Sequence, residues 1–396
     1  MGEPKKEKLI IPDYIKTALS ALEQRGFKAY LVGGCVRDFL LGNSPSDFDI
    51  TTDAMPEQTK KCFEGYEVLT NGIKHGTVTP IIAHKAVEIT TFRTDGEYSD
   101  NRHPDKVEFT SRLGDDLARR DFTVNALAYS EGEGVTDLFG GREDIKNKII
   151  RCVGEADRRF GEDALRILRA MRFASVLGFN IEKETEKSIK KNIKLLKNVS
   201  AERIYGEFIK LLNGENASEI LIKFPCLCQT LFGIELNGRQ KKALKNAKTA
   251  EERLAIIFIY SSPELLKPLK PDNKTYKELH ENIENYRLRL TSKNMGIKEQ
   301  ELFIFKNGLD YESAEKMLNL KELMGSTLDI KRFEADLKYS KKHNHPIEIS
   351  ELDITGNDLK KKGIKGKKIK LTQEFLLKSV IEGKAKNEKN ELLKLI

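Results

Sequence analysis

The chain has 396 residues, of which 39% are hydrophobic and 33% charged, and its formal net charge is +8. This length accommodates roughly two to four domains, and the composition excludes both a wholly disordered chain and a bundle of membrane helices. The basic excess modestly favours a polyanionic partner, although an ordinary soluble protein can carry the same excess.

The sequence contains neither a membrane-spanning segment nor a zinc-binding pattern. No stretch approaches the roughly 20 apolar residues that a bilayer span needs, and residues 1–8 are charged rather than apolar. The five cysteines are an odd count, and their only close pair is Cys226 and Cys228, spaced CxC. We therefore expect a cytosolic protein in a reducing compartment, without structural zinc.

The first 150 residues alternate between helical and strand-like patterns. Apolar residues recur at helical spacing over residues 11–26, and a short apolar run at 29–32 predicts a strand. A Gly-Gly turn, a helix at about 36–41 and a strand that holds Phe48 and Ile50 should follow. Further strand-like runs lie at residues 76–83, 87–92 and 127–129. An α+β unit is therefore expected here.

After about Arg151 the strand patterns nearly disappear. Amphipathic helical patterns replace them at residues 163–177, 202–212, 251–260 and 373–381. We expect the rest of the chain to be all-helical. Its densest charge run is KKKGIKGKKIK at residues 360–370, which suits either a solvated loop or a contact to an RNA backbone.

The stretch VGGCVRD places two glycines between a predicted strand and a predicted helix. Successive glycines at a helix start expose backbone N–H groups, which can form a nest for an anion. Arg37, one turn into that helix, can add a guanidinium to a bound phosphate. The turn at Gly33 and Gly34 therefore predicts a phosphate site.

Asp47 and Asp49 lie two residues apart on the next predicted strand, so their side chains should project from one face. Two carboxylates beside a phosphate nest predict a Mg²⁺ site, because Mg²⁺ takes oxygen ligands from carboxylates and substrate phosphates. The alternative is a solvated strand end, although two aspartates on one face repel each other. Glu88 either supplies a third carboxylate or lies on an exposed strand.

Four ordered motifs carry a family resemblance: GGCVRD, DFD, RRDFTVNALAY at residues 119–129 and GEDALRILRAMRF at residues 161–173. The chain resembles the class II tRNA nucleotidyltransferases, which are the bacterial CCA-adding enzymes and their poly(A) polymerase relatives. The stretches LDITGNDL and GKAKNEKNELL extend the resemblance to the end of the chain.

The resemblance implies a polymerase-β-like nucleotidyltransferase head followed by an all-helical neck, body and tail in a curved arrangement. On this basis we expect a catalytic head at residues 1–150, a neck at 151–215, a body at 216–310 and a basic tRNA-binding tail at 311–396.

The resemblance also implies a nucleotide site in the head. Gly34, Arg37 and Arg120 would bind the nucleotide, and Asp121 would accept a hydrogen bond from the ribose 2′-OH, the group that separates ribonucleotides from deoxyribonucleotides. The alternative for Arg120 and Asp121 is a salt bridge at a helix start that Asp121 caps.

Asp163, Arg166, Arg169 and Arg172 follow one another at spacings of three on a predicted helix. By resemblance, Asp163 and Arg166 read the base, and Arg169 and Arg172 face the triphosphate. Cytosine and adenine both offer an amine beside a ring nitrogen acceptor, whereas uracil and guanine present the opposite polarity. Ordinary surface ion pairs are the alternative.

The polar stretch between Glu88 and Arg119 resembles a loop that family members adding the terminal A possess and relatives adding only CC lack. Residues 95–104 within it are expected to help the A step. The sequence has no His-Asp dyad, so the phosphohydrolase domain of some relatives should be absent, and His75 is expected to be structural.

These features predict addition of C, C and A from CTP and ATP to the 3′ end of tRNA. Asp47 and Asp49 would be the catalytic metal ligands for two Mg²⁺ ions, and the helical parts would grip the acceptor arm. The alternatives are an enzyme that adds only A, a poly(A) polymerase, or an inactive nucleotide-sensing RNA-binding protein.

Overall fold

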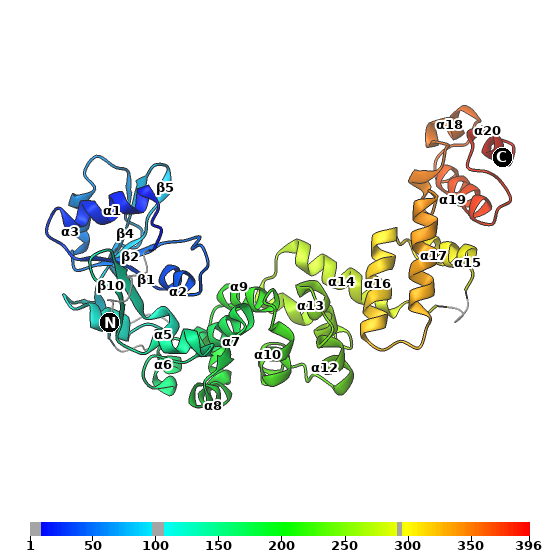
Figure 1. The fold of residues 1–396 in the computed structure, drawn as a ribbon. Coiled ribbons are helices and arrows are strands. Elements are labelled where there is room, and N and C mark those ends of the chain that lie inside the picture. Colours follow the sequence, from blue (N-terminus) through cyan, green and yellow to red (C-terminus); the bar gives the residue numbers. More distant parts are fainter. Residues whose placement is uncertain (1–8, 97–106, 291–294) are drawn as a thin grey trace, which may run out of the picture. The chain divides into compact units, whose positions relative to one another are not determined.

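The computed structural model describes residues 9–96, 107–290 and 295–396. The chain divides into two compact units, Met1–Glu235 and Leu236–Ile396 (Figure 1). The first contains a mixed sheet followed by helices, and the second consists of helices in its described residues. This confirms the α+β class, whereas the division into head, neck, body and tail stays a prediction.

A mixed sheet forms the core of the N-terminal part, and its strands run in the order β10-β9-β1-β2-β6-β4-β3, with β5 paired to β4. All of these pairs are antiparallel except β2 with β6. The strands are β1 (Ala29–Val32), β2 (Asp49–Thr52), β3 (Val68–Leu69), β4 (Thr77–Ile82), β5 (Lys85–Ala86), β6 (Ile89–Thr91), β9 (Leu127–Ser130) and β10 (Gly134–Asp137).

Short helices surround this sheet. Helix α1 buries the apolar residues that recur at helical spacing in the sequence, and it packs against β1, β4 and α3. Strands β7 (Arg93–Asp95) and β8 (Val107–Phe109) form a separate antiparallel pair. The helical segments are α1 (Asp13–Glu23), α2 (Gly34–Leu40), α3 (Pro56–Cys62), η1 (Ile73–His75), α4 (Leu113–Ala118), η2 (Thr123–Asn125) and α5 (Gly141–Lys146).

The second part of the first unit is built around α7, which packs against α9 and α10. Its segments are α6 (Ala156–Glu162), α7 (Leu165–Leu177), α8 (Lys183–Asn192), η3 (Ile193–Asn198), α9 (Ala201–Leu212), α10 (Ala217–Lys223) and α11 (Cys226–Phe232). The expectation of helices alone after Arg151 was wrong at one place. Strand β12 (Asn180–Ile181) pairs in parallel with β11 (Ile149–Ile150), and two residues are too few to give a strand pattern.

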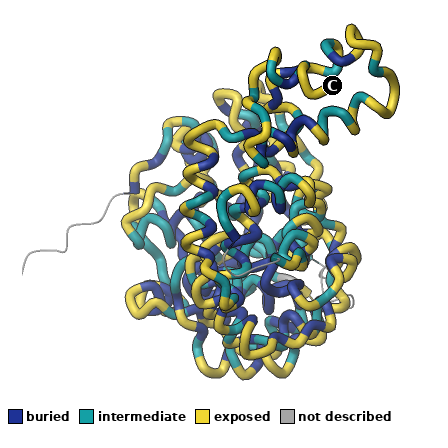
Figure 2. The backbone as a smooth tube through the Cα atoms, turned by 90° about the vertical axis from the view of Figure 1, so that its right-hand side faces the viewer, coloured by how far each residue is buried: buried dark blue, intermediate teal, exposed yellow. Residues whose placement is uncertain are grey.

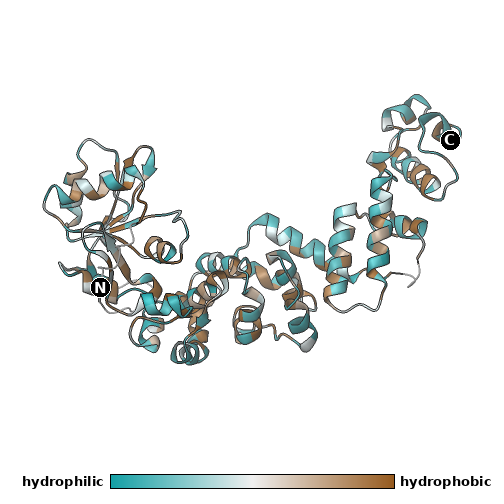
Figure 3. Ribbon diagram, in the orientation of Figure 1, coloured by the Kyte–Doolittle hydropathy of each residue, from teal (hydrophilic) through white to brown (hydrophobic). Residues whose placement is uncertain are grey.

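Two apolar clusters hold the later part of the second unit together. One includes Leu318 and Phe333 and lies among α15, α16 and α17, and the other includes Leu377 and Leu392 and lies among α18, α19 and α20. Figure 3 shows hydrophobic and hydrophilic residues mixed along these helices, as amphipathic helices require. The segments are α12 (Gly238–Leu244), α13 (Ala250–Phe258), η4 (Pro263–Leu269), α14 (Asn273–Arg287), α15 (Ile297–Lys306), α16 (Tyr311–Leu323), α17 (Ile330–Lys342), η5 (Ile349–Glu351), α18 (Gly356–Lys361), α19 (Lys368–Ile381) and α20 (Lys389–Leu393).

Within the described residues, no helix is both long and apolar enough to cross a membrane. The cytosolic location stays a prediction. Figure 2 shows buried residues in dark blue and exposed residues in yellow alternating along the backbone. The bounds of the elements with the clearest sequence patterns agree with the structure. Strand β1 occupies the predicted residues, and α9 begins one residue before its predicted start.

Because α9 packs closely against α7, we expect alanine substitutions at two glycines to change the stability of the protein very differently. A Cβ on Gly214 would lie 2.1 Å from the Ser175 Oγ and 2.6 Å from the Ser175 carbonyl carbon, whereas nothing lies within 4 Å of a Cβ on Gly206. We expect Gly214→Ala to destabilise the protein by about 1 to 3 kcal/mol. Gly206→Ala, inside α9, should be neutral or stabilise it by up to about 1 kcal/mol. Thermal unfolding measures both, and equal midpoints would contradict the packing.

Candidate active site

The predicted phosphate turn lies between β1 and α2. Gly33 has φ 77° and ψ −128°, a backbone conformation that side-chain-bearing residues rarely adopt, and a Cβ at this position would lie 3.3 Å from the Arg120 Nη1. Glycine is therefore required here both by conformation and by the closeness of Arg120. The Arg37 side chain is 11% exposed, and its Nη1 donates to the Asn125 Oδ1 over 2.7 Å.

The two aspartates of the DFD motif lie beside this turn, although only one is in a strand. Strand β2 begins at Asp49, which pairs with Val32 of β1, so Asp47 precedes the strand that was expected to contain it. The pairing places Asp49 next to the start of the Gly33 turn. Partial burial, followed by repulsion from Asp47 and Glu88, raises the pKa of Asp49.

Repulsion among these carboxylates fits a cation site. The Ile50 N–H donates to the Glu88 carbonyl over 3.0 Å, which brings Glu88 beside β2. However, the described residues contain no group of three or more His, Cys, Asp or Glu side chains that could hold a metal. Asp47 lies close enough to raise the pKa of Asp49, whereas Glu88 as a third ligand gains no support within the described residues.

Asp116, which the sequence patterns did not single out, organises the two arginines of the RRD motif. Its side chain has no solvent exposure and accepts from the Arg119 Nε and Nη2 over 2.9 and 2.7 Å and from the Arg120 Nη2 over 3.2 Å. Burial alone would raise the pKa of Asp116, but the two guanidiniums outweigh it and hold this pKa below its usual value. The buried Arg120 Nε has no acceptor among the described residues.

Asp121 joins the sheet part to helix α7. Its carboxylate accepts from the Arg169 Nε and Nη2 over 2.9 and 2.7 Å and from the Asn125 Nδ2 over 3.2 Å. Burial would raise the pKa of Asp121, but Arg169 and Asn125 lower it overall. Because Asn125 also accepts from Arg37, a continuous polar network runs from the Gly33 turn to α7.

The four residues of the α7 motif do not share one helix. Asp163 ends α6 with φ −136°, and its Oδ1 accepts from the Leu165 N–H over 3.1 Å at the start of α7. The expectation of one helix from residue 163 was therefore wrong at its first turn. The Asp163 Oδ2 accepts from the Arg203 Nη2 of α9 over 2.9 Å. Arg203 is a further residue that the sequence patterns missed.

Arg166 is buried and faces the RRD segment. Its Nη1 donates to the Glu162 Oε2 over 2.7 Å, and its Nη2 donates to the Arg119 carbonyl over 3.1 Å. The Arg166 guanidinium is therefore fixed between α6 and the end of α4, rather than free on a helix surface.

Three guanidinium groups lie close to the ring of Phe173. The Cζ atoms of Arg172, Arg169 and Arg37 lie 3.6, 5.3 and 5.4 Å from the ring centroid. Phe173 itself is 5% exposed and makes an edge contact with Phe122, at 5.7 Å between centroids. Arginines from α2 and from α7 therefore converge around one aromatic ring.

The structure thus brings the seven predicted nucleotide-binding residues into one region of the first unit. Gly34, Arg37, Arg120, Asp163, Arg166, Arg169 and Arg172 lie around Asp116, Asp121 and Phe173, with Asp47 and Asp49 beside the turn. Residues 97–106, which include most of the loop expected to help A addition, lie outside the described residues. That expectation stays a prediction.

Three family models cover most of the chain. The Poly A polymerase head domain matches residues 29–151, "Probable RNA and SrmB- binding site of polymerase A" matches residues 178–224, and a tRNA nucleotidyltransferase domain 2 matches residues 247–396. The head match covers the sheet, the Gly33 turn and the RRD segment.

Named relatives agree with these matches. The CCA-adding enzyme of Bacillus subtilis is 36% identical over 393 residues, which cover 94% of this chain and 95% of the relative. The CCA-adding enzyme of Lactobacillus helveticus is 50% identical over 212 residues, so this match spans only about half (53%) of each chain.

A solved structure supports the same relationship. The crystal structure of the Bacillus stearothermophilus CCA-adding enzyme in complex with CTP matches with a TM-score of 0.74 and 32% identity, over 97% of this chain and 98% of that chain.

The Asp116 cluster predicts a pH-dependent loss of stability. Asp116→Asn leaves Arg119 and Arg120 without their buried counter-charge, which should cost about 3 to 5 kcal/mol at pH 7. Because the folded-state pKa of Asp116 is lowered, its contribution is present above about pH 4 and fades as the pH falls through the lowered pKa. Urea unfolding at pH 7 and pH 3 measures this.

The neighbouring Asp115→Asn serves as the control, because Asp115 pairs with Arg112, whose side chain is 78% exposed. This variant should lose less than about 1 kcal/mol. An Asp116→Asn variant that matches the control at pH 7 would contradict the assigned role of the cluster.

Proposed function

The chain belongs to the family of CCA-adding enzymes and poly(A) polymerases, and we propose that it adds C, C and A from CTP and ATP to the 3′ end of tRNA. Pyrophosphate is released at each addition. The observation that carries this proposal is the convergence of the Gly33 turn, the Asp47 and Asp49 carboxylates and the arginines of α7 in one network.

Asp47 and Asp49 are proposed to hold the divalent cations that a nucleotidyltransferase head implies, and we propose Mg²⁺ in this role. When bound, such ions neutralise charge on the α-phosphate and make the tRNA 3′-OH a better nucleophile. The raised pKa of Asp49 supports this assignment, because a cation would relieve the repulsion from Asp47 and Glu88.

Arg120, Arg169 and Arg172 are proposed to bind the triphosphate, and Asp121 the ribose 2′-OH. Within the chain these groups donate to or accept from one another or other carboxylates. Nucleotide binding would therefore exchange protein partners for phosphate and ribose oxygens. The Arg120 Nε, which lacks an acceptor among the described residues, supports a role in binding, since a buried donor without a partner is costly. A mixed role for Asp121, in an ion pair and in ribose binding, fits its contacts.

Asp163 and Arg166 are proposed to select the base. Asp163 would accept from the amine of cytosine or adenine, and Arg166 would donate to the adjacent ring nitrogen. The Leu165 N–H and Arg203 fix the plane of the Asp163 carboxylate, and Glu162 and the Arg119 carbonyl fix the Arg166 guanidinium. A rigid pair suits discrimination, because uracil or guanine would leave fixed donors and acceptors unpaired.

The second unit is proposed to bind the acceptor arm of tRNA. The run at residues 360–370 forms the end of α18, a turn and the start of α19. Every lysine in it is exposed, so the run presents a dense positive surface for a phosphate backbone. The lysines are Lys360, Lys361, Lys362, Lys365, Lys367, Lys368 and Lys370.

A poly(A) polymerase or an A-adding enzyme is the second candidate, because two of the matching family models carry the poly(A) polymerase name. The activity is tested with tRNAs ending in the discriminator base, C, CC or CCA, each incubated with one nucleoside triphosphate at a time. CCA addition predicts C incorporation on the first two substrates, A on the third and none on the fourth. Repeated A addition would favour a poly(A) polymerase, and no incorporation would favour an inactive RNA-binding protein.

We expect Asp47→Ala and Asp49→Ala each to lower nucleotide addition by more than about a thousandfold, because each removes a proposed metal ligand. The affinity for tRNA, measured by filter binding, should stay within about twofold. Asp13→Ala is the control, since Asp13 is fully exposed on α1. Near-parental addition by either active-site variant would contradict the metal assignment.

We expect the lysines at residues 360–370 to bind tRNA phosphates. Replacing Lys365, Lys367 and Lys368 with Gln should flatten the slope of log affinity for tRNA against log salt by about 0.7 to 0.9 for each lysine that binds a phosphate in the parent.

The control for this variant replaces three exposed lysines of α1 and α3, namely Lys16, Lys60 and Lys61, which lie outside the segment matched by the RNA-binding family model. Lys16 already pairs with Asp13, and the control should leave the slope unchanged. If the Lys365, Lys367 and Lys368 variant keeps the parental slope, these lysines do not bind tRNA phosphates and the run is only a solvated surface.

A further inference from the structure

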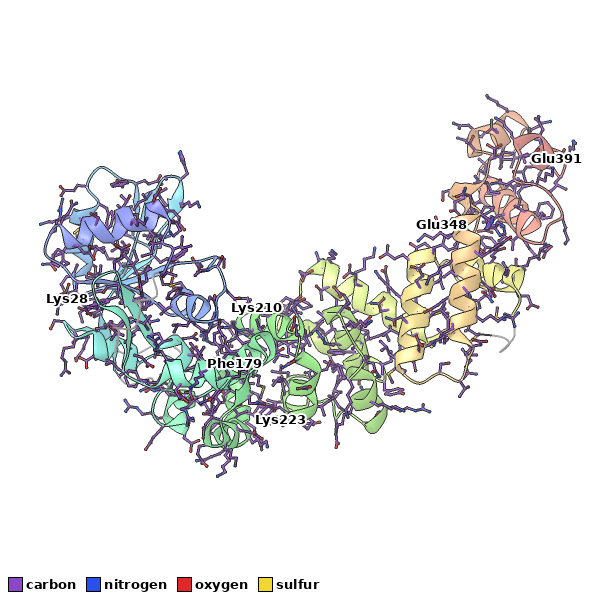
Figure 4. All side chains as sticks on the ribbon, in the orientation of Figure 1. Lys28, Phe179, Lys210, Lys223, Glu348 and Glu391 are labelled. Carbon is purple, nitrogen blue, oxygen red and sulfur yellow. The ribbon has the colours of Figure 1, made fainter. Side chains whose placement is uncertain are left out.

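Glu207 of α9 lies between two arginines that are proposed to meet the triphosphate. It is 8% exposed, and its Oε2 accepts from the Arg172 Nε over 2.8 Å while its Oε1 lies 3.7 Å from the Arg169 Nη1. Figure 4 draws the side chains of this region and labels Lys210, which follows Glu207 by about one turn of α9. No sequence motif used above contains Glu207.

The helix that carries Glu207 is held firmly against α7. Arg203, Glu207 and Leu211 are four residues apart on α9 and therefore share one face. Arg203 binds Asp163, Glu207 binds Arg172, and the Leu211 carbonyl accepts from the Ser175 Oγ over 2.7 Å. The packing of α9 against α7 therefore fixes the position of the Glu207 carboxylate.

The charge of Glu207 offsets a local excess of positive charge. Arg37, Arg169 and Arg172 all lie over the Phe173 ring, and like charges at this spacing repel. Burial lowers the pKa of Arg172, and the carboxylate of Glu207 opposes that shift. Burial would lower the pKa of Arg169, but the carboxylates of Asp121 and, to a smaller extent, Glu207 raise this pKa overall.

We propose that Glu207 is a positioning residue that holds Arg169 and Arg172 in the orientation that receives the triphosphate. The Arg172 Nε bond to Glu207 leaves the other nitrogens of that guanidinium available to phosphate oxygens. The same negative charge weakens nucleotide binding, because it opposes the charge of the triphosphate. Glu207 therefore favours rapid transfer over tight binding, and it acts equally on CTP and ATP because the arginines that it contacts are proposed to meet the triphosphate, which both nucleotides carry.

This inference rests on the proposed function and is tested on the full chain with two variants of Glu207. Glu207→Gln keeps the shape of the side chain and removes its charge, whereas Glu207→Asp keeps the charge and withdraws it from Arg172. Glu202→Gln is the control, because Glu202 is exposed on the same helix. The measurements are the dissociation constants for CTP and ATP and the single-turnover rates of C and A addition to tRNA.

We expect Glu207→Gln to bind both nucleotides about tenfold more tightly and to transfer both about tenfold more slowly. Glu207→Asp should keep the parental affinity within about twofold and lose about tenfold in rate. Glu202→Gln should match the parent in both. Opposite movement of affinity and rate is the signature that a merely structural role for Glu207 would not produce.

Parental affinity and rate in Glu207→Gln would overturn the inference, as would weaker nucleotide binding or an effect confined to one nucleotide. If Glu207→Gln fails to fold, judged by circular dichroism, Glu207→Asp decides: a tenfold slower rate supports the role, and the parental rate overturns it. Failure of the proposed function is distinct, because the parent itself would then add no C or A to any tRNA.

Discussion

The partly buried ion pair between Asp121 and Arg169 is the interaction on which the site depends. Asp121 belongs to the segment that leads into the sheet strand β9, and Arg169 belongs to α7, so the pair joins two parts of the first unit. Its two hydrogen bonds of 2.9 and 2.7 Å fix the guanidinium plane. Through Asn125, the same carboxylate is tied to Arg37 beside the Gly33 turn. Removing it would leave several buried groups unpaired at once.

This pair is one of three ion pairs that allow several arginines to lie close together. Each guanidinium has a carboxylate: Arg120 has Asp116, Arg169 has Asp121, and Arg172 has Glu207. These internal pairs keep the buried charge balanced, and a bound triphosphate can take over some of the same donors. In our account, the nucleotide competes with protein carboxylates for prearranged arginines, which reduces the cost of ordering these side chains on binding.

Local patterns in the sequence predicted the parts of this site that lie within one segment. The two glycines at the start of α2 and the short spacing of Asp47 and Asp49 were recognisable because both are local patterns, although Asp47 lies just before β2 rather than in it. The position of Asp163 was predicted wrongly, because the apolar pattern continues through the break between α6 and α7. The break occurs where the Asp163 side chain caps Leu165, a detail that residue spacing cannot reveal.

Asp116, Phe173, Arg203 and Glu207 were missed for a different reason. Arg203 and Glu207 act through residues that are far away in the sequence, namely Asp163 and Arg172. Asp116 pairs with Arg119 and Arg120, only three and four residues away, but its complete burial comes from tertiary packing. A buried glutamate on an amphipathic helix looks like any surface glutamate until the facing helix is known. Only the packing of α9 on α7 identifies it as part of the site.

The most direct test of this account is a double-mutant cycle on Asp121 and Arg169 in the nucleotide-free protein. Hydrogen exchange of the backbone amides of α7 would give the free energy of local opening in the parent, Asp121→Asn, Arg169→Gln and the double variant. The account predicts a coupling energy of about 1 to 3 kcal/mol, because either single change removes the partner that makes two hydrogen bonds to the other residue and leaves that residue only its weaker contacts. Additive effects, with a coupling energy near zero, would contradict the claim that this pair holds the site together.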